Sequence, residues 1–228
     1  DALRVASASR PRKLGRQPRF GRPVGTDRVA VVDTATDELL GAWDTDPSST
    51  ANRAHAGVFS TDGRRLYVAS DSTSKLIALD PRTGEILWTA TVPNAHELAV
   101  AHDGKTAYVS GRTAGTLRIV EKGKLLPEPV SGVPKVLDKG QGGLLDVAVH
   151  PDYAKNGWIY LSFSDPGPEG SAMTKIVRGK LKGNAFVDVQ DVFKAPAELY
   201  RTGPNHFGSR IVFDRKGHIY FSIGERFQ

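Results

Sequence analysis

The sequence predicts an all-β protein, a four-bladed β-propeller in which N-terminal strands complete the C-terminal blade. Three observations support this fold class: a strand–turn–strand unit that recurs along the chain, a turn-rich composition, and a strand count that closes a ring. Glycine and proline number 24 and 14 among the 228 residues, which favours many short strands over helices. No segment shows the apolar periodicity that a helical repeat requires.

The recurring unit is an apolar strand, a turn that contains Asp or Gly, and a second strand centred on a tyrosine. The turn glycines of the first two copies, Gly63 and Gly104, lie 41 residues apart. Glycine after aspartate supplies the positive φ that a tight hairpin needs. We expect the recurring tyrosines to pack in the core; they are Tyr67, Tyr108, Tyr160 and Tyr220.

Two outer strands are predicted to follow each of the first three units, at residues 75–80 and 85–92, 116–121 and 124–130, and 173–181 and 186–193. The fourth unit, within residues 210–223, has only two strands, whereas strands at 28–33 and 38–44 precede the first unit. Joining these N-terminal strands to the last two completes a fourth blade and leaves no free edge at the seam. The alternative is an incomplete ring that associates with a second chain.

The positive charge is concentrated at the N-terminus. The formal net charge is +6, but residues 1–27 hold seven basic and two acidic side chains, so residues 28–228 carry only +1. This segment lacks apolar periodicity and is predicted to be a flexible basic arm before a single propeller domain, residues 28–228. A solvated extension, or a strap along the edge of the domain, is favoured over a contact with nucleic acid or anionic lipid.

The residue types exclude several function classes. The chain has no cysteine, which excludes disulfide scaffolds, iron–sulfur clusters and thiol nucleophiles. No apolar run is long enough to span a membrane. The sequence also contains no nucleophile elbow and no phosphate-binding glycine loop.

The two halves of the domain carry different sequence marks. Within residues 28–115, the marks are RLYVA at 65–69, LDPRTG at 79–84 and KTAYVS at 105–110. This half resembles the tyrosine-valine-threonine-asparagine (YVTN) type of propeller repeat. That resemblance implies the fold and says little about activity.

Residues 116–228 carry more specific motifs, GQGGLLDVAVHPDY at 140–153 and NHFGSRIVF at 205–213. This half is similar to the soluble pyrroloquinoline-quinone-dependent aldose sugar dehydrogenases, the glucose/sorbosone dehydrogenase family. The resemblance implies a sugar substrate, the cofactor pyrroloquinoline quinone (PQQ), and a periplasmic or secreted location. It places the catalytic base at His206 and cofactor contacts at Gln141, His206 and Arg210. An imidazole suits this role, because oxidation of a sugar lactol needs a base at neutral pH.

The sequence departs from that family in ways that leave a second function open. The family enzyme is a larger, six-bladed propeller whose remaining quinone and calcium contacts come from later blades, and this sequence ends at Gln228. Asn205 replaces an acidic neighbour of the histidine, and no calcium loop of the Asp-x-Asp-x-Asp-Gly type occurs. The alternative is a non-catalytic propeller, reduced or chimeric, that binds or scaffolds without a complete PQQ and calcium site.

Two further histidines indicate a candidate metal site. His55 and His96 each lie eight residues before their turn glycine, so they share a register. We expect both to reach the channel mouth near His206, where converging imidazoles could bind a transition metal. The corresponding residues of the later units are Leu145 and Ser209, and histidines at strand entrances also hydrogen-bond to backbone.

Overall fold

The computed structural model describes residues 3–7, 28–33, 35–46, 54–214 and 216–226. These residues form five antiparallel sheets, and within each sheet the strands are hydrogen-bonded in the order in which they follow along the chain. The first two sheets are β1 (Leu3–Ser7), β2 (Arg28–Asp33) and β3 (Leu39–Asp44), then β4 (Ala54–Phe59), β5 (Leu66–Ser70), β6 (Lys75–Leu79) and β7 (Ile86–Thr91). The only α-helix in these ranges is the single turn α1 (Tyr153–Asn156), so no helix in them is long and apolar enough to cross a bilayer.

The remaining three sheets repeat the pattern. The third holds β8 (Ala95–Val100), β9 (Thr106–Gly111), β10 (Thr116–Glu121) and β11 (Lys124–Leu125). The fourth holds β12 (Leu144–Val149), β13 (Trp158–Pro166), β14 (Ala172–Lys182) and β15 (Ala185–Lys194), and the last is the pair β16 (Gly208–Phe213) and β17 (Ile219–Ile223). The predicted strands therefore occur, and their order confirms the all-β fold class.

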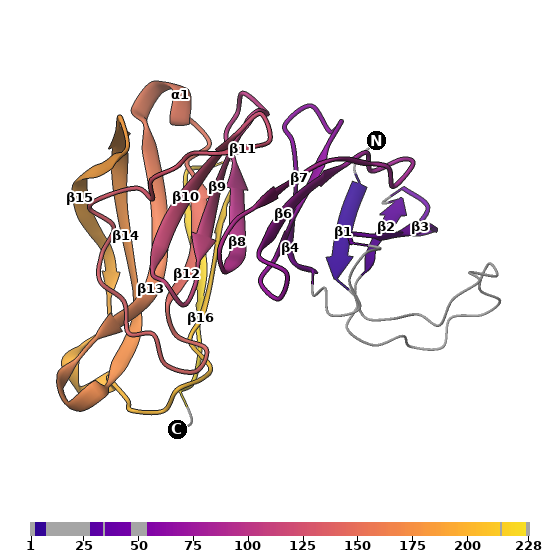
Figure 1. Cartoon of the computed structure of the whole chain (residues 1–228). Coiled ribbons are helices and arrows are strands. Elements are labelled where there is room, and N and C mark those ends of the chain that lie inside the picture. Colours follow the sequence, from indigo (N-terminus) through magenta and orange to yellow (C-terminus); the bar gives the residue numbers. More distant parts are fainter. Residues whose placement is uncertain (1–2, 8–27, 34, 47–53, 215, 227–228) are drawn as a thin grey trace.

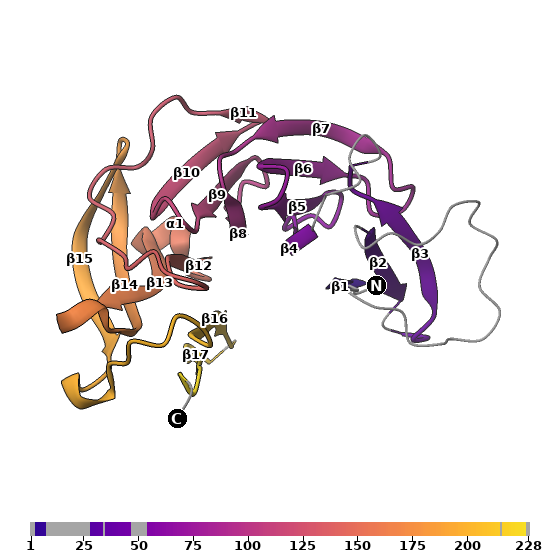
Figure 2. The ribbon, with the colours of Figure 1, turned by 60° about the horizontal axis from the view of Figure 1, so that its bottom comes forward.

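The sheets stand side by side along an arc (Figures 1 and 2), with β1–β3 at one end and β16–β17 at the other. The first strand of each sheet lies on the inside of the arc, because β1 contacts β4, β4 contacts β8, β8 contacts β12, and β12 contacts β16. Residues at the ends of these inner strands are thus brought together although they are far apart in sequence.

The predicted seam is wrong. Strands β2 and β3 do not pair with β16 and β17; the two groups belong to different sheets. The reason is that β1 occupies the hydrogen-bonding edge of β2, with Leu3 opposite Asp33 and Ser7 opposite Val29. Part of the predicted arm is thus a strand, while residues 8–27 lie outside the described residues. The described strands form an arc of five sheets, not a ring of four.

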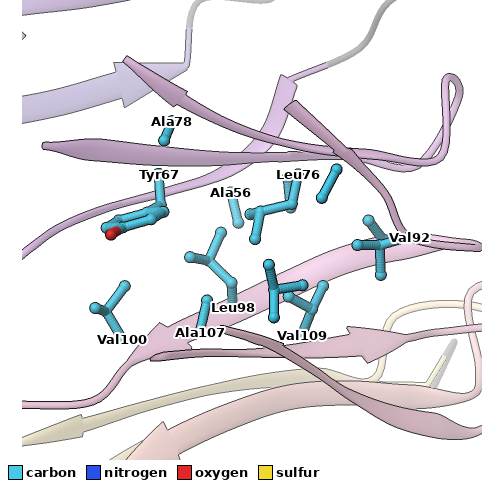
Figure 3. Packing of buried hydrophobic residues seen from close by; sticks show 13 residues of the cluster. Ala56, Tyr67, Leu76, Ala78, Val92, Leu98, Val100, Ala107 and Val109 are labelled. Atoms are coloured by element: carbon cyan, nitrogen blue, oxygen red, sulfur yellow. The ribbon is translucent and has the colours of Figure 1, made fainter. Parts of the chain in front are cut away.

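The core consists of apolar layers between successive sheets. Between the second and third sheets, Leu76, Val92 and Val109 are fully buried, and Leu98 is nearly so. Figure 3 shows these side chains interleaved between the two sheets. Burial of apolar surface stabilises the fold by about 25 cal/mol per Å². Because this surface is buried between neighbouring sheets, each sheet is stabilised mainly by the sheets beside it on the arc.

The recurring tyrosines show the same dependence on a neighbouring sheet. Tyr67, Tyr108 and Tyr160 are at most 5% exposed, and the Tyr67 hydroxyl donates to the carbonyl of Gly104 in the next sheet at 2.8 Å. Tyr220 is 57% exposed, since no later sheet follows β17 among the described residues. The core-packing prediction is confirmed for the first three tyrosines and is wrong for Tyr220.

One predicted strand is much shorter than expected. The segment predicted at residues 124–130 is a strand only over Lys124–Leu125. Pro127 and Pro129 lack the N–H group that a regular ladder needs. Leu126 and Val130 still donate to carbonyls of β10, each at 2.9 Å, so the segment follows β10 without regular pairing.

Candidate functional site

The inner ends of the strands enclose a cavity of about 400 Å³. All five residues singled out from the sequence line it: His55, His96, Gln141, His206 and Arg210. The three histidines thus line one cavity, but the group of potential metal ligands consists of His55, His96 and Glu97 and does not include His206. The remaining lining residues are Glu97, Arg112, Leu145, Asp146, Phe207, Gly208, Ser209 and Ser222.

A glycine-rich loop brings Gln141 to His206. The Gln141 Oε1 atom accepts a hydrogen bond from the backbone N–H of His206 at 2.8 Å, and the backbone N–H of Gln141 donates to the carbonyl of Pro204 at 2.8 Å. Gly140 has φ +61°, and a Cβ there would lie 2.5 Å from that same carbonyl. A side chain at residue 140 would thus push the two family-like segments apart.

Two charged side chains, those of Glu225 and Arg226, hold the His206 side chain and its loop. The Nδ1 atom of His206 contacts Oε1 of Glu225, just after β17. The guanidinium of Arg226 is buried, donates to the carbonyls of Asn205 and Gly203, and lies 3.5 Å from the centre of the Phe207 ring. A carboxylate on one ring nitrogen orients the imidazole.

Substitution of Gly224 is expected to displace this loop. A Cβ at Gly224 would lie 1.7 Å from the His206 carbonyl oxygen, so Gly224→Ala must move the backbone that carries His206. We expect at least a tenfold loss of ligand affinity at the cavity and only a small change in the urea midpoint, because β16 and β17 pack on one side only. Gly217→Ala controls for backbone strain without a clash, since its φ of +87° disfavours a side chain although a Cβ there meets nothing within 4 Å. Equal ligand affinities in the two variants would contradict this placement.

A second cluster lies at the other side of the cavity. The His55 and His96 ring centroids are 3.7 Å apart, and His55 Nδ1 lies 3.3 Å from Oε1 of Glu97. Glu97 is buried and also pairs with Arg210, whose Nη1 lies 2.9 Å from Glu97 Oε2. Burial and the neighbouring His55 lower the pKa of His96 to about 3, so this ring is neutral at pH 7.

Asp146, which lines the same cavity, links the inner strands β12 and β16. Its Oδ2 accepts from the backbone N–H of Ile211 at 2.7 Å and its Oδ1 from that of Val147 at 2.8 Å. Burial and the nearby Glu97 carboxylate raise the pKa of Asp146 to about 7. A buried carboxyl group that titrates near neutrality is typical of functional sites.

Sequence reasoning missed four charged groups of this site: Glu97, Arg112, Asp146 and Glu225. Arg112 lines the cavity, and its buried Nε has no hydrogen-bond partner. Gly143 (φ +134°) abuts its backbone, with a Cβ position 2.1 Å from the Arg112 carbonyl oxygen. Asp146 had a sequence signal, because the other residues of its strand β12 are all apolar. Glu97 directly follows His96 on β8, whose remaining residues are apolar.

The arc of sheets and the cavity at their inner ends define a propeller-like, all-β protein with a polar cavity. The Glucose / Sorbosone dehydrogenase family model matches residues 92–228, and the chain belongs to this family. Residues 25–126 match a second model, described as Outer membrane protein assembly factor BamB. The YVTN assignment of the N-terminal half stays a prediction.

Individual relatives agree with this family. The chain is 45% identical over 116 residues to Aldose sugar dehydrogenase YliI of Escherichia coli (strain K12), which covers 50% of this chain and 31% of that protein. The structure of the soluble Aldose sugar dehydrogenase (Asd) from Escherichia coli in the apo-form superposes with a TM-score of 0.53 at 40% identity, over 58% of this chain and 38% of that chain. This chain therefore spans less than a third of the length of the curated relative.

A more distant likeness supports the fold alone. The Cps50 (Swd1) β-propeller domain of Myceliophteria thermophila has a TM-score of 0.54 at 14% identity, over 74% of this chain and 54% of that chain. The propeller-like arrangement of sheets thus extends across both halves of the chain.

Proposed function

We propose that this chain is an aldose sugar dehydrogenase-like quinoprotein that binds PQQ and uses His206 as the general base. The observation that supports it most is the hydrogen bond between Gln141 and the backbone of His206. These residues come from the two segments that resemble the family, and both face one cavity.

The residues present fit the cofactor. PQQ carries three carboxylates, and the cavity offers Arg112 and Arg210, whose planar guanidinium groups match carboxylate geometry. The buried Nε of Arg112 lacks a hydrogen-bond partner, which is costly unless a ligand supplies an acceptor. Binding pockets for small molecules typically enclose about 300–1,000 Å³, and this cavity lies in that range.

The chain's own residues would hold the reactants and move the proton. Arg112 and Arg210 would bind carboxylates, and Gln141 would fix the loop that carries His206. The imidazole of His206, oriented by Glu225, would accept the proton of the sugar's anomeric hydroxyl while hydride leaves the anomeric carbon that bears this hydroxyl, which gives the lactone. When bound, the quinone supplies the two-electron acceptor. We also propose a periplasmic or secreted location, which the resemblance supports.

Calorimetric titration of the whole chain with PQQ, with and without calcium, tests this function. We expect binding at one site, weakened at least tenfold in Arg112→Met and in Gln141→Ala because each removes a hydrogen-bonding group from the cavity. Arg178→Met is the matched control, since that arginine, on β14, pairs with Gln190 of β15 and does not line the cavity. Absence of binding would overturn the proposal and favour the non-catalytic propeller.

A further inference from the structure

Two imidazoles and a carboxylate converge at the edge of the cavity. One potential ligand atom from each of His55, His96 and Glu97 lies within 4.8 Å of the other two. The three residues come from the neighbouring inner strands β4 and β8. No other such group of three or more occurs among the residues described.

The spacing matches the preferences of a specific metal. Zinc binds imidazole nitrogen and carboxylate oxygen at about 2.0–2.2 Å in tetrahedral geometry, which puts neighbouring ligand atoms about 3.3–3.5 Å apart. The distance of 3.3 Å between His55 Nδ1 and Glu97 Oε1 matches this separation between two ligand atoms. The two rings lie close together, tilted by 33° with centroids 3.7 Å apart, so both can offer a nitrogen to one ion.

A second observation points to a ligand at the same place. The Nδ1 atom of His96 is buried and has no hydrogen-bond partner, and the whole residue is only 9% exposed. An unpartnered buried nitrogen costs free energy, and a bound cation would remove that cost.

We propose that His55, His96 and Glu97 form a transition-metal site, best suited to Zn²⁺, with its remaining position open to the cavity. This site does not depend on the proposed dehydrogenase activity. The positively charged guanidinium of Arg210 lies against Glu97, so it competes with a metal cation for that carboxylate. We therefore expect moderate affinity, in the micromolar range, rather than the tight binding of a structural zinc site.

Titration of the chelator-treated whole chain with Co²⁺ and then Zn²⁺ tests the proposal. We expect one equivalent of Co²⁺ to give the visible absorption of a tetrahedral site, and Zn²⁺ to remove it. Ca²⁺ should give no response, since it prefers oxygen ligands. His55→Ala and Glu97→Gln should each weaken Zn²⁺ binding at least tenfold. Because the His55 side chain is 38% exposed, its variant is expected to fold normally.

Two further variants sharpen the outcome. His218→Ala is the matched control: that exposed histidine pairs with Asp214 at 2.8 Å without a third ligand, so Zn²⁺ affinity should be unchanged. Arg210→Met should raise Zn²⁺ affinity severalfold by removing the competing cation. Lack of stoichiometric uptake, unchanged affinity in His55→Ala, or weaker binding in Arg210→Met would each overturn the assignment.

Discussion

Replacement of His206 by alanine is expected to lower kcat/KM for PQQ-dependent aldose oxidation by about 10²–10⁴-fold, the range for loss of a general base. The free energy of unfolding should change little, because the His206 side chain is 45% exposed. The backbone N–H that bonds to Gln141 remains in this variant, so the glycine-rich loop keeps its anchor. A dye-linked assay with several aldoses, together with urea unfolding, measures both quantities.

Glu225→Gln separates positioning from proton transfer. Its side chain contacts His206 Nδ1 and does not line the cavity, so we expect a smaller loss in kcat than for His206→Ala, with KM unchanged. His218→Ala removes a histidine with a similar carboxylate partner, Asp214, outside the cavity and should leave the rate unchanged. Wild-type rates in His206→Ala would refute its role as base.

The strands were predictable because their signals are local. Alternating apolar residues and Asp-Gly turns lie within each hairpin, and strands such as Arg28–Asp33 and Thr116–Glu121 have the predicted bounds. The seam was not predictable in the same way, because it depends on which segment reaches the edge of β2. Leu3–Ser7 occupies that edge, although five residues beside a strongly basic stretch give little sequence signal.

The candidate site likewise contains residues that the sequence predicts and residues that it does not. His55 and His96 share a register, and a repeated register places equivalent residues on neighbouring inner strands, so their meeting followed from the spacing. Their partner Glu97 and the orienting Glu225 depend on side-chain directions at strand ends. The register of β8 is irregular between Ala95 and Leu98, the segment that carries Glu97, and such an irregularity redirects a side chain without a clear sequence mark. Glu225 follows the end of β17, where no strand alternation fixes its direction.

Two buried groups in the cavity are expected to give opposite pH dependences of stability. Asp146 has a pKa raised to about 7 by burial and Glu97, so folding takes up a proton between about pH 4 and 7, and this group stabilises the protein as the pH falls. His96 has a pKa lowered to about 3 by burial and His55, so folding releases a proton between about pH 3 and 6.5. This group destabilises the protein as the pH falls.

In the wild-type protein these two slopes should nearly cancel between about pH 4 and 6.5, each amounting to about 1.4 kcal/mol per pH unit. Removing either group should expose the other. The stability of Asp146→Asn, relative to wild type, should fall by about 3–4 kcal/mol as the pH decreases from 7 to 4. The stability of His96→Gln, relative to wild type, should rise by about 3 kcal/mol from pH 6.5 to 4.

Urea unfolding of the chelator-treated proteins at half-unit pH intervals measures these differences. Each variant is compared with wild type, which removes the contributions of the other titrating groups, and EDTA prevents metal binding at His96 from masking its slope. The absolute stability of Asp146→Asn will be lower at every pH, because its amide cannot accept from both Val147 and Ile211. The change of the unfolding free energy with pH, and not its absolute value, therefore tests the prediction. His218→Gln controls for the loss of an exposed imidazole. Difference curves of the same sign for Asp146→Asn and His96→Gln would show that the two groups do not titrate in opposition.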